Sequence, residues 1–156
     1  MAAGKFIFFD SWGKYEASGN IHFMISNGIA ASLLKASYTP GTSNHSVFTQ
    51  VSAHLATSSG SIVNAINLSG RKISSSGAGV IKYIANNIDA FSAGGSEILA
   101  KYLVLYGAGS ASVGGGIERP LMGFFNLETL TTTGVQASQV KITWPSYGIA
   151  KKVMNP

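Results

Sequence analysis

Apolar residues in this chain occur in short runs that are separated by glycine, serine and asparagine. Runs of this length with turn-forming residues between them are typical of β-strands joined by loops, not of long helices. Segments rich in β-branched and aromatic residues predict strands, at 21–25, 29–36, 61–68, 80–84, 97–106, 121–127 and 139–144. The clearest alternation is in QVKITW, where Val140, Ile142 and Trp144 share one face.

Two segments have the spacing of a helix. In FIFFDSWGKYE (6–16), Phe6 and Phe9 fall on one side of a short N-terminal turn or helix. In residues 44–55 the apolar positions recur at helical spacing behind Asn44, a favoured N-cap residue: Val47, Phe48, Val51 and Leu55. The serine- and glycine-rich stretch SSSGAG (74–79) predicts a loop.

These elements predict a mainly β fold, an antiparallel β-sandwich or jelly-roll-like structure with one or two short helices. The 156 residues are enough for a single domain over 1–156 with a short extended N-terminus. The last segment, IAKKVMNP (149–156), has two lysines and a final proline, and we expect it to be a C-terminal arm that becomes ordered on a partner.

The most apolar run, ILAKYLVLYG (98–107), is interrupted only by Lys101. It is about ten residues long against the roughly twenty that a membrane helix needs, so no membrane span is expected. In a regular strand, Lys101 would share a face with three leucines: Leu99, Leu103 and Leu105. The other face, with Tyr102 and Val104, would point to the core, and we expect a partner to cover part of the face that carries Lys101.

Charged residues make up 11% of the chain and hydrophobic residues 46%, so much of the surface is uncharged. Such a surface indicates that part of it is covered by another molecule. The net charge of +5 favours an acidic partner. The basic residues are scattered singly, however, and we expect no direct, sequence-specific binding of nucleic acid. The absence of cysteine excludes disulfides and thiolate metal sites.

The sequence does not predict an enzyme. Its six carboxylates are widely separated, and no acid and base pair stands out. His45 and His54 are nine residues apart and would lie on opposite sides of one helix, and His22 is distant, so no metal site is expected. The glycine-rich stretch GAGSASVGGG lacks the Lys-Ser/Thr ending of a phosphate-binding loop. No catalytic, cofactor-binding or metal-ligating residue is therefore assigned.

The order of several motifs resembles that of a family of small virion proteins of tailed phages. The motifs, in chain order, are SLLKASYTP, NHSVFTQVSAH, FSAGGSEILAKYLVLYG, PLMGFFNL and VKITWPSYGI. The resemblance covers most of the chain, from Ile21 to Ile149. The chain departs from it at SIVNAINLSG, where members usually have Gly-Tyr-x-x-Gly-Gly, and in a longer loop at 107–116.

This resemblance implies a capsid cement (decoration) protein on the outer surface of the virion. It would bind and bridge subunits of the major capsid protein, as a homo-oligomer (dimer or trimer), without catalytic residues or a cofactor. We expect contacts with acidic capsid ridges from basic residues: Arg71, Lys72, Lys101, Arg119, Lys151 and Lys152. A head-to-tail adaptor or tail-tube protein is an alternative role in a virion. A carbohydrate-binding jelly-roll module is an alternative of another class, and its platform would be exposed aromatics: Trp12, Trp144 or Tyr147.

Overall fold

The computed structural model describes residues 5–19, 22–24, 28–76, 79–92, 97–108, 110–111, 117–127, 135–137 and 139–153. The described chain is mainly β, every strand pairing in it is antiparallel, and it contains one α-helix. The predicted fold class, an antiparallel sandwich with one or two short helices, is confirmed.

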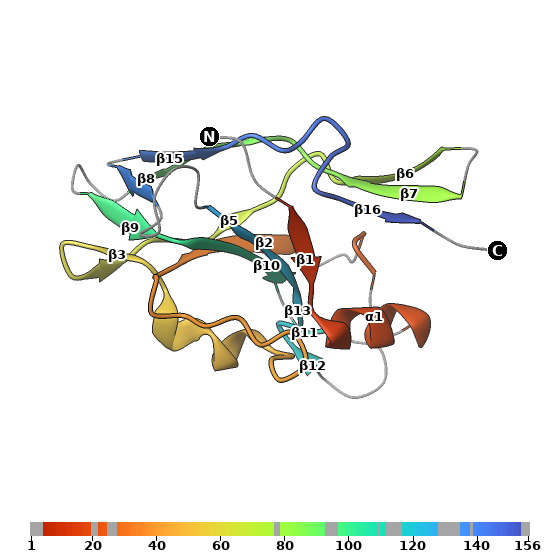
Figure 1. Cartoon of the computed structure of the whole chain (residues 1–156), viewed down its shortest axis with the longest axis horizontal. Coiled ribbons are helices and arrows are strands. Elements are labelled where there is room, and N and C mark those ends of the chain that lie inside the picture. The colour runs from red at the N-terminus through yellow and green to blue at the C-terminus, as the bar shows by residue number, and fades with distance from the viewer. Residues whose placement is uncertain are drawn as a thin grey trace.

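A five-stranded sheet runs through the middle of the molecule (Figure 1). Its strands, in spatial order, are β1 (Phe6–Phe8), β13 (Leu121–Asn126), β10 (Tyr102–Gly107), β2 (Ile29–Leu34) and β5 (Ile66–Asn67). Strands β2 and β13 lie where the sequence predicts them, because both are short apolar runs that end at turn-forming or polar residues.

A second layer lies above this sheet in the view of Figure 1. It contains a three-stranded sheet of β16 (Ala150–Val153), β7 (Val80–Ile84) and β6 (Lys72–Ser76). It also contains the pair formed by β15 (Gln139–Ile142) and β8 (Ile88–Ser92). In β15 buried and exposed residues alternate as predicted, with Val140 and Ile142 inside.

The remaining elements are short. The helix α1 (Asp10–Ala17) and two 3₁₀ helices, η1 (Phe48–Gln50) and η2 (Ser52–His54), lie below the central sheet in Figure 1. Three further strand pairs complete the fold: β3 (Thr57–Ser58) with β4 (Ser61–Ile62), β9 (Ile98–Ala100) with β14 (Val135–Ala137), and β11 (Ser110–Ala111) with β12 (Ile117–Glu118).

The central sheet is buried on both faces. Its upper face packs in one core cluster with the second layer, where Leu103 and Phe125 meet side chains such as Phe91 and Ile142. Its lower face forms a second cluster in which Val104 packs with residues of the loop and 3₁₀ region. Because neither face is exposed, all six residues of β2 and all six of β10 are buried.

The prediction for the faces of residues 98–107 is wrong. Ile98 and Ala100 pack in the same core cluster as Leu103 and Leu105, so the alternation shifts by one residue at Lys101. At this position the backbone bends between β9 and β10, while the Lys101 N–H still donates to the carbonyl of Leu34 at 2.8 Å. The leucines of β10 are therefore covered by this chain itself, and a partner is not needed for that purpose.

The two predicted helical segments are corrected in detail. Residues 6–16 contain a strand, β1, before the helix, which begins at Asp10 and buries Trp12 completely. Residues 44–55 form η1 and η2 instead of one α-helix, and Val47, not Asn44, is the N-cap of η1. The Gln50 side chain accepts hydrogen bonds from the backbone N–H groups of Ser46 and Val47, which satisfies donors at this helix start.

Several other predicted boundaries are wrong. Residues 22–24 contain a turn instead of a strand, residues 61–68 divide into β4 and β5, and residues 74–76 of the predicted loop belong to β6. Part of the predicted C-terminal arm is also structured. Ile149 is fully buried and Ala150–Val153 form β16, so residues 149–153 belong to the fold; residues 154–156 lie outside the described part.

The packing of Phe6 on Gly123 gives a testable prediction. A Cβ atom at Gly123 would lie 2.3 Å from Phe6 Cζ and 2.5 Å from the carbonyl oxygen of Ile7. We expect Gly123→Ala to lower the free energy of unfolding by about 1–3 kcal/mol through overpacking. In the control Gly13→Ala, the new Cβ meets nothing within 4 Å apart from its chain neighbours and the backbone of its own helix. That helical substitution should stabilise by about 0.5–1 kcal/mol. Urea unfolding measures both, and equal stability of the two variants would contradict the packing.

Candidate functional site

The sheet of β6, β7 and β16 brings together four lysines from distant parts of the sequence. Strands β6 and β7 form a hairpin, and β16 adds to the other side of β7. The register places Ser74, Lys82 and Lys151 directly opposite one another across the three strands. In antiparallel sheets directly opposite residues project from the same face, so this register fixes which side chains are neighbours.

One face of this sheet carries lysine from each of its strands. Alternation from the central row places Lys72 on the same face as Lys82 and Lys151. Val80, Ile84 and Val153 share this face, and Val153 is 62% exposed. We call these residues, together with Ser74, the lysine face. It includes no carboxylate, and Figure 1 shows its sheet extending to one side of the molecule.

The charges on the lysine face are unfavourably placed in the isolated chain. Lys82 and Lys151 are directly opposite, which is the register position where two like charges destabilise a strand pair. Lys151 also lies over the ring of Tyr147, with Nζ 5.3 Å from the ring centroid. An anionic partner at this face would remove the repulsion, so the arrangement suits recognition of an acidic surface.

The opposite face of the same sheet is fixed to helix α1. Tyr83 is 4% exposed, and its hydroxyl donates to Glu16 Oε1 at 3.0 Å. Lys152, which follows Lys151 and therefore points the other way, forms an ion pair with Glu16 Oε2. Burial, and then the adjacent Glu16 carboxylate, raise the pKa of Tyr83 above its ordinary value. This cluster therefore holds the sheet on the fold by the face opposite the lysine face.

A hollow of about 410 Å³ lies beside this cluster, between α1 and β7. Its wall includes the ion pair of Glu16 and Lys152 and the exposed His22. Because each oxygen of Glu16 already has a partner and the charge of Lys152 is balanced, the pair has no excess charge with which to select an ionic ligand. The geometry therefore favours a structural role for these residues.

Of the six predicted contact residues, the structure brings Lys72 and Lys151 together and separates the others. Lys152 is bound to Glu16 on the opposite face. Arg71 donates to the carbonyl of Phe23, and Arg119 stacks on Phe48 at 4.8 Å from the ring centroid.

Lys101 lies at the bend before β10, which belongs to the five-stranded sheet and not to the sheet of β6, and its Nζ is 5.7 Å from the Tyr102 ring centroid. The six residues therefore do not share one face, and their contact with a capsid stays a prediction. Sequence reasoning also missed Lys82. Alternation in a strand over 80–84 could have assigned Lys82 to a face, but only the pairing of β16 with β7 places Lys82 beside Lys151.

The aromatic residues considered for sugar binding are not exposed platforms. Trp12 is fully buried, and Trp144 is 8% exposed with its Nε1 donating to the carbonyl of Asn86. The expectation that these two tryptophans lie on the surface is wrong. Tyr147 is half-buried and lies against Lys151.

His45 and His54 are closer than the prediction of a single helix implied. Both pack against Tyr38, with ring centroids 5.5 Å from it in each case. The hydroxyl of Tyr38 is hydrogen-bonded to His45 Nδ1 at 2.9 Å. Burial raises the pKa of Tyr38 to about 12. Within the described residues, no three histidine, aspartate or glutamate side chains gather as metal ligands would.

The described part of the chain also has no helix that is both long and apolar enough to cross a bilayer.

Comparisons with family models, curated proteins and solved structures found no match to this chain.

The burial of Tyr38 predicts how stability depends on pH. Below pH 10 the tyrosine is protonated in both the folded and the unfolded chain. Between pH 10 and about 12 only the unfolded form ionises, so its proton loss favours unfolding. We expect the free energy of unfolding to fall with pH in this window, and Tyr38→Phe to make the fall less steep. Urea unfolding of both proteins at pH 9, 10 and 11, that is in steps of about one pH unit, measures this dependence of the free energy of unfolding on pH. Identical slopes for the two proteins would contradict the burial of Tyr38 as the cause.

Proposed function

We propose that this chain is a capsid cement (decoration) protein of a tailed phage, which binds the outer shell and bridges subunits of the major capsid protein. The observation that carries the proposal is the lysine face: lysines from three strands on one projecting sheet, with no carboxylate among them. The ordered motifs that resemble those of small virion proteins support the same role. The role is mechanical and requires neither a catalytic residue nor a cofactor.

The structure suits a protein that attaches by its surface. Apolar residues of the lysine face, such as Val153, lie between the basic side chains, so a partner would bury apolar area and neutralise charge at the same time. A rigid base for the face comes from the contacts of Tyr83 and Lys152 with α1. A rigid surface loses less conformational entropy when it binds than a flexible one does.

The gain from cementing comes from repeated contacts. A protein that touches neighbouring subunits binds the second at a high effective concentration, so modest individual contacts of about 800 Å² per partner give slow release. A homo-oligomer, as a dimer or trimer on the shell, would multiply these contacts further. Such attachment opposes separation of the bridged subunits, which is how the head would be stabilised.

The role is tested with empty shells assembled without this chain. The purified protein should bind them, raise their resistance to heat and osmotic shock, and appear in a reconstruction as density repeated over the shell. Hundreds of copies per particle agree with cement. A few to a dozen copies at one vertex would instead identify an adaptor or tail component, and no binding or no gain in resistance would refute the proposal.

The lysine face yields a prediction in which stability and binding change in opposite directions. Lys82→Glu places a carboxylate directly opposite Lys151 and replaces repulsion by attraction. We expect the isolated variant to be more stable by about 0.2–1 kcal/mol. Its binding to shells should nevertheless fall at least tenfold at low salt, and the difference should shrink as salt is added.

The matched control is Lys14→Glu, which makes the same charge change at an exposed position on α1. Shell binding should be the same as for the unchanged chain. Sedimentation with the shells measures binding, and thermal unfolding measures stability. If both variants weakened binding equally, net charge and not the lysine face would be responsible.

A further inference from the structure

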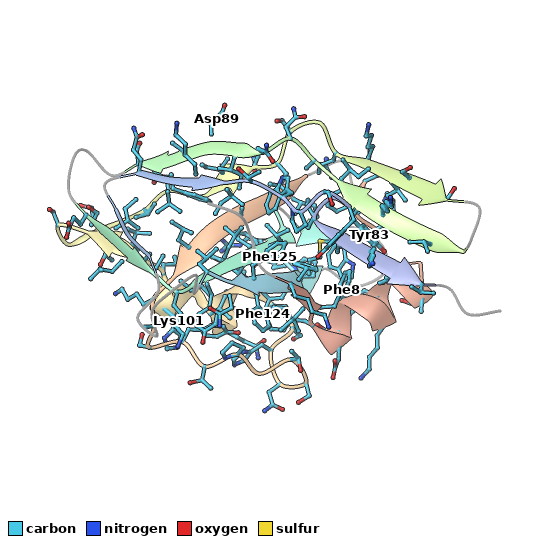
Figure 2. All side chains as sticks on the ribbon, turned by 45° about the horizontal axis from the view of Figure 1, so that its top comes forward. Phe8, Tyr83, Asp89, Lys101, Phe124 and Phe125 are labelled. Carbon is cyan, nitrogen blue, oxygen red and sulfur yellow. The ribbon has the colours of Figure 1, made fainter. Side chains whose placement is uncertain are left out.

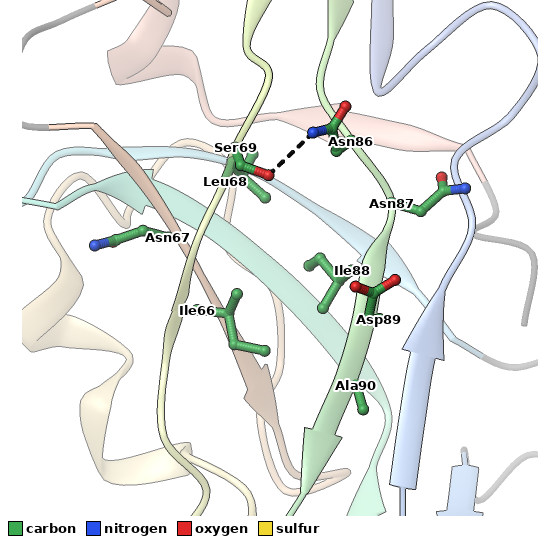
Figure 3. A pocket seen from close by; sticks show the side chains of 9 residues that line it. All are labelled: Ile66, Asn67, Leu68, Ser69, Asn86, Asn87, Ile88, Asp89 and Ala90. Atoms are coloured by element: carbon green, nitrogen blue, oxygen red, sulfur yellow. Dashed lines mark hydrogen bonds between the residues drawn. The ribbon is translucent and has the colours of Figure 1, made fainter.

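A cleft lies between the segment that precedes β6 and the segment that follows β7 (Figure 3). Residues 66–69 and 86–90 form its two sides, and its volume is about 200 Å³. At one end the two sides are joined, because Asn86 N–H donates to the Ser69 carbonyl at 2.9 Å and Asn86 Nδ2 donates to Ser69 Oγ at 3.2 Å. Beyond this point the sides separate: β5 pairs with β2, and β8 pairs with β15.

Both sides of the cleft are edges of sheets. Strand β5 is the last strand of the central sheet, and β8 is paired only with β15 among the described strands. Leu68 N–H donates to the carbonyl of Ile29 on β2. Successive residues of a strand direct their backbone groups to alternate sides. The N–H and C=O of Asn67 therefore point away from β2 and toward the cleft, and so does the carbonyl of Ser69. The Ser69 carbonyl already accepts from Asn86, so Asn67 supplies the donor and the acceptor that an added strand would pair with.

The cleft is lined by both apolar and polar side chains, and the apolar ones are the more buried. Leu68 is 7% exposed and Ile88 is 4% exposed, and both belong to the core cluster between the two layers. Asn67 and Asp89 are exposed at the rim, and Asp89 is the one charged residue among the nine that line the cleft. An occupant that fits has an apolar side chain for the interior and a basic residue near Asp89. A small polar molecule would leave the strand edge unpaired.

The cleft is continuous with the lysine face. Ser69, at the closed end of the cleft, is followed within three residues by Lys72, and Asn86 comes two residues after Ile84. Strand β8, on one side of the cleft, belongs to the same layer as the lysine face, and Figure 2 shows Asp89 of this strand at the outer margin of that layer. A surface that docks on the lysine face therefore lies next to the cleft.

We propose that the cleft between β5 and β8 binds an extended segment of the shell protein that carries a basic residue and adds as a strand to the edge of β5. The assignment of the segment to the shell protein rests on the function proposed above. The preference of the cleft for an extended peptide does not depend on that function. The two contacts have opposite polarity, since the lysine face takes an acidic surface and the cleft takes a basic segment. Together they would fix the orientation of the chain on the shell.

The binding preference is tested with random heptapeptides displayed on yeast and selected on the purified full chain. Selected peptides should have apolar residues at alternate positions and a lysine or arginine. Asn67→Pro removes the N–H that points into the cleft, and Ala90→Trp fills the space between the sides. We expect each to weaken binding of the purified selected peptides at least tenfold, whereas Lys14→Glu leaves it unchanged.

Asp89→Asn is a milder variant that keeps the shape of the cleft. It should reduce the preference for basic peptides over their neutral counterparts without abolishing binding. Circular dichroism and thermal unfolding establish that each variant is folded. Failure to select any peptide, or equal binding of the peptides to the unchanged chain and to the Ala90→Trp and Asp89→Asn variants, would overturn the proposal.

The source of the segment is tested by placing the photoreactive residue p-benzoylphenylalanine at position 67 and irradiating the chain with empty shells. Cross-links should join position 67 to one segment of the shell protein, and position 49, on the exposed part of η1, should give none. Cross-links to a second copy of this chain would overturn the assigned source. If the chain did not bind shells at all, the proposed function would fail, while peptide selection would still decide whether the cleft binds a strand.

Discussion

Burial of the central sheet on both faces is the constraint on which the rest of this structure depends. Antiparallel sheets often leave one face in water, but here the strands β2 and β10 are buried over their whole length. Each face needs its own cover, and the chain supplies two: the second layer above and the loop with η1 and η2 below. This explains why the strands of the central sheet read as continuous apolar runs and carry almost no charge.

The same constraint moves charge to the periphery. A lysine within the central sheet would be desolvated without a partner, which is costly. Lys101 accordingly lies at a bend, where a one-residue shift in alternation keeps Ala100 and Leu103 inside and leaves the lysine half-buried. The three-stranded sheet β16-β7-β6 extends beyond the core, so one of its faces can hold several lysines. Its other face supplies Tyr83 to the core cluster and Lys152 to the ion pair with Glu16.

Much of the fold could be predicted from the sequence because local pattern and burial agree in β2, β13 and β15. The predictions fail where long-range packing decides. Val51 and Phe48 are buried, as the helical spacing implied, but they lie in two 3₁₀ turns instead of an α-helix. Residues before them are held outside a helix, because Ser46 is hydrogen-bonded to the Gln50 side chain and Val47 forms a β-bridge with Pro120. The serine-rich residues 74–76 become a strand only because β7 pairs with them. The lysine face follows from that pairing and from β16, and neither is visible in composition or periodicity.

The division of the stretch 66–92 among three sheets links the fold to its surface. In the middle of this stretch, β6 and β7 pair with each other and carry two of the lysines. At its two ends, β5 and β8 pair with different strands, and their edges face each other across the cleft. Exposed strand edges promote unwanted association, and proteins usually block them with charge, proline or a covering segment. At this cleft the lining offers a single charge and no proline. In the proposed attachment, one partner would occupy both this strand edge and the neighbouring lysine face, and so would pair the one and neutralise the other.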